Sequence, residues 1–180
     1  MIELVDYGFG PDARSRATAA RMPGREGALA ALETFYYALN SKDLETLVAG
    51  WAADELVQLN NPIGGILRSR DAVRALYERV FAGSLNVQVT FGDAATYWQD
   101  DSVVFAGREV GTYQHPELGE RPLQIRTTRI FRYADTWQQI HHHGSIDDAE
   151  ALARYQSAVR WGSGPAGAGQ EGGCCCDAGC

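Results

Sequence analysis

The order of apolar patterns along the chain predicts an α+β domain, with helices packed on one face of a concave antiparallel sheet. Apolar residues recur at helical spacing between about residues 26 and 83, and strand-like runs follow from residue 85 to residue 143. Helices followed by consecutive strands are typical of this class. A length of 180 residues and a hydrophobic content of 45% suffice for one such domain.

Three helices are expected in the first half of the chain. The first spans about residues 26–40, because its apolar residues follow the i, i+3, i+4, i+7 rule: Leu29, Leu32, Phe35, Tyr36 and Leu39. Asp43 is expected to cap a second helix, and Ser69 opens a third that ends near Gly83. The third helix buries one face, formed by Val73, Leu76, Tyr77 and Val80.

Strands dominate the second half of the chain. Four runs, residues 85–98, 102–114, 123–133 and 136–143, are separated by short polar turns and by the longer loop around QHPELGERP. They predict an antiparallel meander. A short strand at 55–60 and a turn at 61–65 precede the third helix, and Asp147 is expected to cap a last short helix.

These elements define three segments. Residues 1–24 have no clear period and are expected to form an N-terminal arm, with disorder as one option. Residues 25–160 form the single α+β domain with its short C-terminal helix, and residues 161–180 a flexible Gly/Cys-rich tail. The tail contains all four cysteines, Cys174, Cys175, Cys176 and Cys180, so it is either unstructured or a soft-metal or modification site.

The composition disfavours several kinds of partner. A net charge of −7 and a pI near 5.0 disfavour binding to nucleic acid or to an anionic membrane, since both need clustered Lys and Arg. The N-terminus lacks the basic and apolar regions of a signal peptide, and no run is long enough to span a membrane. A cytoplasmic location is therefore expected.

Several motifs resemble a known superfamily. These are N-x-x-D-L and W-A-x-D near residues 40–54, N-P-I-G at 61–64, T-T-R-I-F at 127–131 and W-x-x-I-H-x-H-x-S at 137–145. In this order they resemble the nuclear transport factor 2-like superfamily over residues 26–146, with the SnoaL-like and ketosteroid-isomerase-like bacterial members most similar. The resemblance implies a cone-shaped roll: three N-terminal helices on a strongly curved antiparallel sheet, around an apolar cavity, paired as a homodimer through the sheet.

The resemblance also bears on activity. In ketosteroid isomerases a catalytic Asp precedes the Pro-x-Gly of the loop, and the matching residue here is Asn61, which cannot act as a general base. The positions of their oxyanion-hole Tyr and Asp correspond to Phe35 and Arg129. Classical steroid isomerisation is therefore not expected. The association domain of calcium/calmodulin-dependent kinase shares the T-R-x-aromatic and H-x-H-x-S motifs, so the alternative of an assembly module stays open.

Arg129 and the histidines are the main candidate site residues. The resemblance implies that Arg129 points into the pocket, where its charge must meet a carboxylate, either from Glu109 or Asp93 or from a ligand. Strand alternation predicts that four residues share one face: Trp137, Gln139, His141 and His143. His141 and His143 are candidate acid/base residues, or hydrogen-bonded structural ones; metal binding is disfavoured because no third ligand stands at a recognisable spacing.

Other candidate residues are expected to line the pocket and to offer hydrogen-bonding groups to the ligand. Asn61, Tyr36, Tyr77 and Trp137 are expected to bind ligand alongside Arg129, whereas His115, in the polar loop, is expected to be exposed and without chemistry. We therefore expect a cofactor-independent lyase of dehydratase type, or an isomerase, acting on a small apolar or aromatic ligand with an optional anionic group. The alternative is a non-catalytic ligand-binding or homodimeric assembly module.

Overall fold

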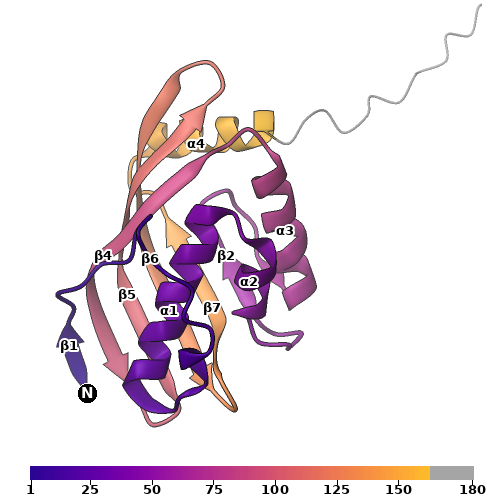
Figure 1. The fold of residues 1–180 in the computed structure, drawn as a ribbon. Helices are drawn as coiled ribbons and strands as arrows, with labels where there is room; N and C mark the ends of the chain where they lie inside the picture. Colours follow the sequence, from indigo (N-terminus) through magenta and orange to yellow (C-terminus); the bar gives the residue numbers. More distant parts are fainter. Residues whose placement is uncertain (163–180) are drawn as a thin grey trace, which may run out of the picture.

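The computed structural model describes residues 1–162 (Figure 1). Its helices are α1 (Gly24–Ser41), α2 (Leu44–Ala49), α3 (Arg70–Ala82) and α4 (Ala149–Gly162), with a 3-10 turn at Ala19–Arg21. Its strands are β1 (Ile2–Leu4), β2 (Gln58–Asn60), β3 (Leu67–Arg68), β4 (Val87–Trp98), β5 (Ser102–His115), β6 (Gly119–Tyr133) and β7 (Trp137–Ser145). The predicted tail, apart from its first two residues at the end of α4, lies outside the described residues.

The predicted helices and two of their caps are confirmed. The carboxylate of Asp43 accepts a hydrogen bond from the backbone N–H of Thr46 at 3.0 Å, and the hydroxyl of Ser69 accepts one from Ala72 at 3.3 Å. The predicted cap of the last helix is wrong by one residue. Asp148 accepts the bond from the N–H of Ala151, while Asp147 forms an ion pair with Arg126.

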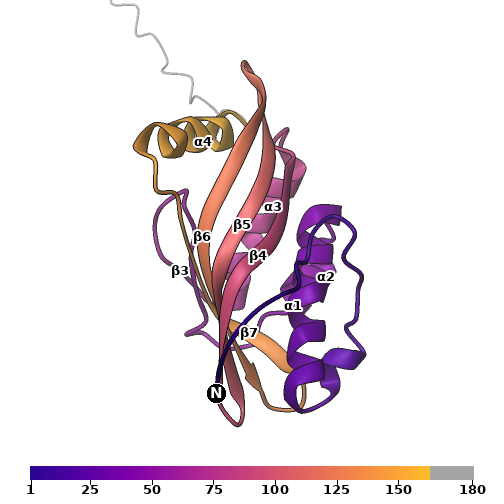
Figure 2. The same ribbon diagram turned by 90° about the vertical axis from the view of Figure 1, so that its left-hand side faces the viewer.

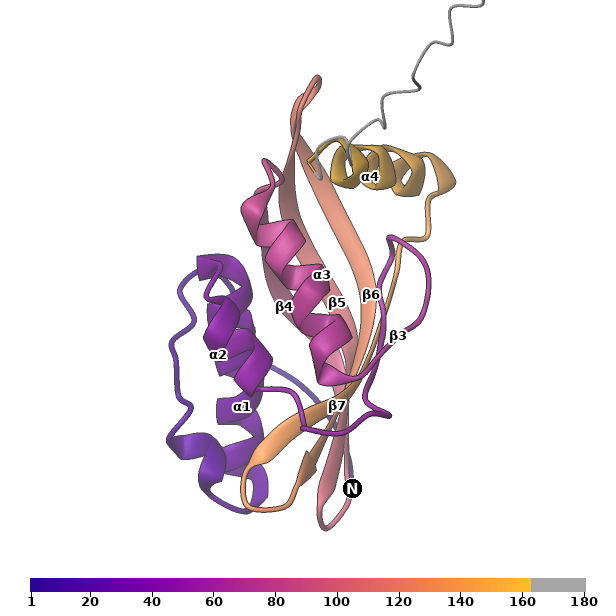
Figure 3. The same cartoon turned by 90° about the vertical axis from the view of Figure 1, so that its right-hand side faces the viewer.

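The sheet contains the predicted four-stranded meander but extends beyond it. Its strand order is β1-β4-β5-β6-β7-β2-β3, and β2 runs parallel to β7, so the sheet is mixed rather than purely antiparallel. Helices α1, α2 and α3 lie on one side of the long strands (Figures 2 and 3). The expected strong curvature is not observed: the long strands twist but do not curl tightly.

The N-terminal arm is ordered, which corrects the expected irregular segment. β1 pairs antiparallel with β4 through Ile2 and Tyr97, and a further bridge joins Phe9 to Phe91. Backbone hydrogen bonds to the edge of β4 hold the arm, and a strand of three residues is too short to produce a readable period. The arm is therefore part of the sheet.

The loop after β5 is also shorter than predicted. β5 and β6 stay paired as far as His115 and Gly119, so most of QHPELGERP belongs to a hairpin. His115 is buried rather than exposed: its Nδ1 accepts hydrogen bonds from the N–H groups of Glu117 and Leu118, and its Nε2 bonds with Ser157 Oγ of α4 at 3.3 Å. This histidine holds the turn and ties α4 to the end of the sheet.

Candidate functional site

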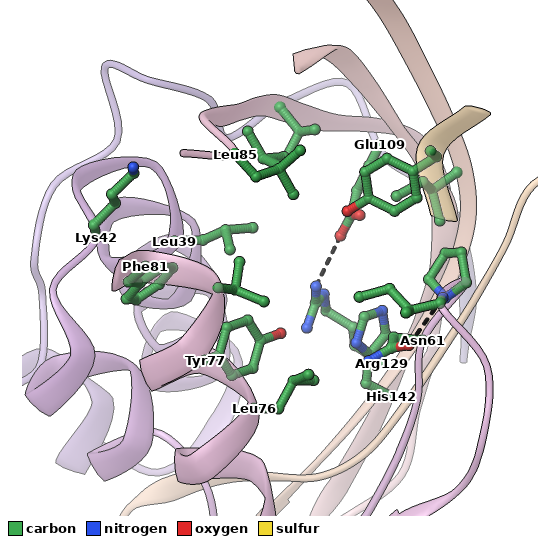
Figure 4. Close-up of a pocket in the computed structure, with 17 residues that line it drawn as sticks. Leu39, Lys42, Asn61, Leu76, Tyr77, Phe81, Leu85, Glu109, Arg129 and His142 are labelled. Atoms are coloured by element: carbon green, nitrogen blue, oxygen red, sulfur yellow. Dashed lines mark hydrogen bonds and ion pairs between the residues drawn. The ribbon is translucent and has the colours of Figure 1, made fainter. Parts of the chain in front are cut away.

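A cavity of about 70 Å³ lies between α3, the end of α1, α4 and the inner face of the sheet (Figure 4). Most of its wall is apolar, as expected from the buried face of α3 and the inward residues of β4. Its lining comprises Leu39, Lys42, Asn61, Pro62, Ile63, Leu76, Tyr77, Val80, Phe81, Leu85, Val87, Val89, Glu109, Ile125, Arg129, His142 and Tyr155. A few polar groups thus face an apolar space, which is the usual character of a small-molecule site.

Arg129 forms a fully buried ion pair at the base of this cavity. Its Nη2 donates to Glu109 Oε1 at 2.7 Å, its Nε to the hydroxyl of Tyr36 at 2.9 Å, and its Nη1 to Gln139 Oε1 at 2.9 Å. The guanidinium also lies 3.7 Å from the ring centroid of Phe35. Of the two partners considered from the sequence, Glu109 is the one present, while Asp93 pairs with Arg108.

The surroundings keep Arg129 charged. Burial by itself would lower the pKa of Arg129, yet the neighbouring Tyr36 and Glu109 raise it above its ordinary value. Tyr36 also donates from its hydroxyl to Glu109 Oε1 at 2.8 Å, so the tyrosine bridges both ends of the ion pair. The charge of Arg129 is therefore paired with Glu109 within the protein and does not require a ligand carboxylate.

Glu109 has one oxygen left for a ligand. Both hydrogen bonds from Tyr36 and Arg129 go to Oε1, and no group in residues 1–162 bonds to Oε2. The hydroxyls of Tyr77 and Tyr155 likewise lack a partner among those residues, and Figure 4 shows the Tyr77 hydroxyl directed into the cavity. One carboxylate oxygen and two phenol groups are thus available to a molecule in the cavity.

The two phenols stay protonated near neutral pH. Burial raises the pKa of Tyr77 to about 12, and burial together with the charge of Glu109 raises the pKa of Tyr155 further. Both side chains can therefore donate hydrogen bonds to a ligand oxygen.

The cavity contains His142, not the predicted His141 or His143. Ile130 pairs with His141 and Phe131 with Gln139, so Ile140 is an extra residue that forms a bulge in β7. The bulge shifts the alternation by one residue, and the side chains of His141 and His143 belong to the outer face. The predicted common face is therefore correct for Trp137 and Gln139, which are buried, and wrong for His141 and His143.

His142 is a buried, neutral histidine. Its Nε2 lies 2.9 Å from the hydroxyl of Thr127, while its Nδ1 has no partner among residues 1–162. Burial, followed by the nearby charge of Arg129, lowers the pKa of His142 well below its ordinary value. The imidazole is therefore neutral near pH 7, and its hydrogen bond with Thr127 positions the ring.

The remaining candidates divide between the cavity and the core. Asn61 and Tyr77 line the cavity, and Tyr36 lies behind it as a partner of Glu109. The carbonyl of the Asn61 side chain accepts a hydrogen bond from the N–H of Ile63 at 3.0 Å, which leaves its amide group for a ligand. Trp137 is buried near α1 and is absent from the lining, so its predicted ligand contact is not supported.

Besides His142, sequence reasoning missed three polar lining residues: Glu109 as a functional group, Tyr155 and Lys42. Glu109 sits at an inward position of β5, where a carboxylate among apolar neighbours is itself an uncommon signal. Tyr155 comes from the C-terminal helix, and only the tertiary structure brings it to the cavity. Within residues 1–162, no group of three or more His, Cys, Asp or Glu is placed to hold a metal ion. No helix there is long and apolar enough to cross a membrane.

The helices on one face of a mixed sheet, with a partly open pocket between them, form the nuclear transport factor 2-like fold. A comparison with protein families agrees: the SnoaL-like domain matches residues 28–149. The chain therefore belongs to the SnoaL-like domain family. A comparison with proteins of curated function gave no significant match.

Solved structures share this fold at low sequence identity. A candidate dehydratase of the NTF2-like family from Streptomyces avermitilis is 23% identical, with a TM-score of 0.60 over 66% of this chain and 93% of that one. A candidate calcium/calmodulin-dependent kinase II association domain from Xanthomonas campestris is 22% identical, with a TM-score of 0.58 over 70% and 90%. A ketosteroid isomerase-like protein from Erwinia carotovora atroseptica is 17% identical, with a TM-score of 0.58 over 67% and 94%.

Proposed function

We propose that the protein binds a small, partly apolar carbonyl compound in this cavity and catalyses a cofactor-independent dehydration or isomerisation. One observation carries the proposal: the same largely apolar cavity is lined by Glu109, which has one oxygen free of hydrogen bonds, and by Tyr77 and Tyr155, whose hydroxyls have no partner among residues 1–162. A base beside two hydrogen-bond donors is the arrangement that proton abstraction next to a carbonyl needs.

The proposed steps follow from these groups. Glu109 accepts a proton from the carbon next to the carbonyl, while Tyr77 and Tyr155 donate hydrogen bonds to the carbonyl oxygen, where negative charge develops. In a dehydration, the bond from the adjacent carbon to its hydroxyl then breaks, and the leaving hydroxide takes the proton from Glu109 to form water. In an isomerisation, Glu109 returns the proton to another carbon. Either way the carboxylate is regenerated.

His142 has a secondary role in this proposal. Because its imidazole is neutral and hydrogen-bonded to Thr127, it can orient the substrate or relay a proton. The base expected from the sequence was a histidine of β7. The structure favours Glu109, since His141 and His143 lie outside the cavity.

The test compares Glu109→Gln and Tyr77→Phe with the wild-type protein. NMR in deuterium oxide would follow proton exchange and water loss in a panel of small β-hydroxy ketones and β-hydroxy acids. We expect Glu109→Gln to abolish turnover and Tyr77→Phe to lower it about 10²- to 10³-fold, the usual cost of one oxyanion donor. Glu120→Gln, an exposed position on β6, is the control. Unchanged turnover in Glu109→Gln would refute the proposed base.

A second candidate function is non-catalytic ligand binding or assembly. It is favoured by the pairing of the Arg129 charge with Glu109 within the protein and by the fold shared with candidate kinase association domains. It predicts saturable binding to the cavity without product formation in the same NMR panel.

A further inference from the structure

Lys42 is a singular residue in this chain. It is the only lysine among 180 residues, and every other side chain counted as Lys or Arg is an arginine. It follows the last residue of α1 and lines the cavity, close in the structure to Leu39, Phe81 and Leu85 of the lining. Figure 4 places it on the α1 side, across the cavity from Glu109 and Arg129.

The backbone at Lys42 does not require this side chain. Lys42 adopts the left-handed conformation, with φ 58° and ψ 32°, at the C-cap of α1. Glycine is the usual residue in that conformation because a β-carbon strains it. The cap itself depends on the backbone N–H of Lys42, which donates to the carbonyls of Ala38 and Leu39. A strained lysine where glycine would serve points to a role for the ammonium group.

The ammonium group has no protein partner among residues 1–162. No ion pair or hydrogen bond joins it to another side chain there, and the adjacent Asp43 is engaged by the N–H and the hydroxyl of Thr46 at 3.0 Å and 2.7 Å. Within the lining, the charges of Arg129 and Glu109 offset each other, and His142 is neutral. Lys42 is therefore the uncompensated charge of the cavity.

We propose that the ligand is a carboxylic acid anion, whose carboxylate binds to Lys42 at the rim while its polar reactive end lies at Glu109 and Tyr77. The apolar residues of α3 then contact the hydrocarbon part of the ligand between its two polar ends. A single ammonium group suits a singly charged carboxylate better than a phosphate, which usually recruits arginines or a helix N-terminus. This inference rests on the proposed function in one respect only, namely that the cavity is a ligand site.

The single lysine permits a direct labelling test. Reductive methylation of the full chain modifies two amines, the Lys42 side chain and the α-amino group of Met1, which peptide mass spectrometry distinguishes. The probes are hexanoate and its uncharged isostere hexanamide. We expect hexanoate, but not hexanamide, to slow methylation of Lys42 at least tenfold, with Met1 as the internal control. Equal rates at Lys42 with and without hexanoate would overturn the proposal.

Two substitutions separate binding from folding. Lys42→Gly relieves the left-handed strain and should leave the melting temperature unchanged or higher, while Lys42→Gln retains a polar side chain of similar length. Calorimetry should show hexanoate binding about tenfold weaker in both variants, as expected for loss of one charge-assisted hydrogen bond, with hexanamide affinity unchanged.

The outcomes distinguish the two proposals. If hexanoate binds equally well to wild type and both variants, the role of Lys42 is wrong and the cavity remains a ligand site. If neither hexanoate nor hexanamide binds the wild-type protein, the carboxylate proposal fails together with the binding step of the proposed function. If turnover fails but hexanoate binds through Lys42, only the proposed chemistry is wrong.

Discussion

At the scale of single residues, the site depends on one buried ion pair. Arg129 donates a hydrogen bond of 2.7 Å to Glu109 inside an apolar domain, and Tyr36 and Gln139 accept two further bonds from the guanidinium. A buried ion pair costs desolvation, so packing alone gives no reason to have one. What it provides is a carboxylate held in a fixed orientation with one free oxygen.

Removing one partner of this ion pair is expected to destabilise the fold. Arg129→Met removes the charge partner and leaves Glu109 buried and unpaired, which should lower the free energy of unfolding by about 3–5 kcal/mol. Urea denaturation would measure the change. Adding Glu109→Leu to Arg129→Met should restore most of that loss, because the isolated charge is then gone. A double variant as unstable as the single one would contradict this account.

The residues of the site were only partly predictable. The pairing of Arg129 with Glu109 was one of two options, and Asn61 and Tyr77 were correctly expected in the cavity. The predicted inward face of His141 and His143 was wrong, because strand alternation was extended through a bulge that nothing in the residue pattern indicates. Tyr155 could not be predicted, since its contact with the cavity depends on where the last helix packs.

At the scale of elements, bulges determine which side chains reach the inside. In β4 the register shifts between Gly92 and Ala95, so that Gly107 of β5 packs closely against Ala94. Asp93 adopts a left-handed conformation at this point. The bulge directs Ala94 inward and Asp93 outward, where it pairs with Arg108.

Gly107 and Gly92 provide a matched pair of substitutions. A β-carbon at Gly107 would lie 2.5 Å from that of Ala94 and 2.8 Å from the carbonyl oxygen of Gly92, whereas one at Gly92 meets nothing within 4 Å. We expect Gly107→Ala to destabilise the fold by about 1–3 kcal/mol and Gly92→Ala to be nearly neutral. Thermal unfolding followed by circular dichroism would compare them. Similar melting temperatures for the two variants would refute the packing argument.

The element pattern itself was largely predictable. Helices α1 to α3 and the four long strands have strong periodicity because each buries one face. β1 and β3 were not predicted, because strands of two or three residues depend on backbone pairing with a neighbour rather than on side-chain alternation. The same reason explains why the arm was expected to be irregular.

At the scale of the whole molecule, one row of largely apolar residues crosses the outer face of the sheet and is partly exposed in a single chain. Ile2, Tyr97, Val104, Ile130 and His141 are consecutive cross-strand neighbours on this face. Ile2 is 70% exposed and Tyr97 42% exposed. A row of this kind across a sheet usually packs against another surface, so we propose, as expected from the sequence, a homodimer through the sheet.

Light scattering tests the dimer. We expect the wild-type protein to be dimeric at micromolar concentration and Ile130→Asp to raise the dissociation constant roughly a hundredfold or more, because it buries an unpaired carboxylate in both copies. Leu56→Asp is the control, since Leu56 is 78% exposed and lies outside the sheet. A wild-type monomer, or a dimer that tolerates Ile130→Asp, would rule out this interface.

The N-terminal arm and α4 lie outside the segment that matches the family, yet both belong to the folded domain. Residues 28–149 match the SnoaL-like domain, yet β1 covers the backbone edge of β4 and α4 supplies Tyr155. Gln156 of α4 donates to the carbonyls of Pro62 and Ile63 at 3.1 Å and 3.3 Å, beside Asn61. A chain trimmed to the shared segment would expose a strand edge prone to aggregation and lose one wall of its cavity. Relatives that differ at these two ends can thus differ in solubility and ligand choice while sharing the same central fold.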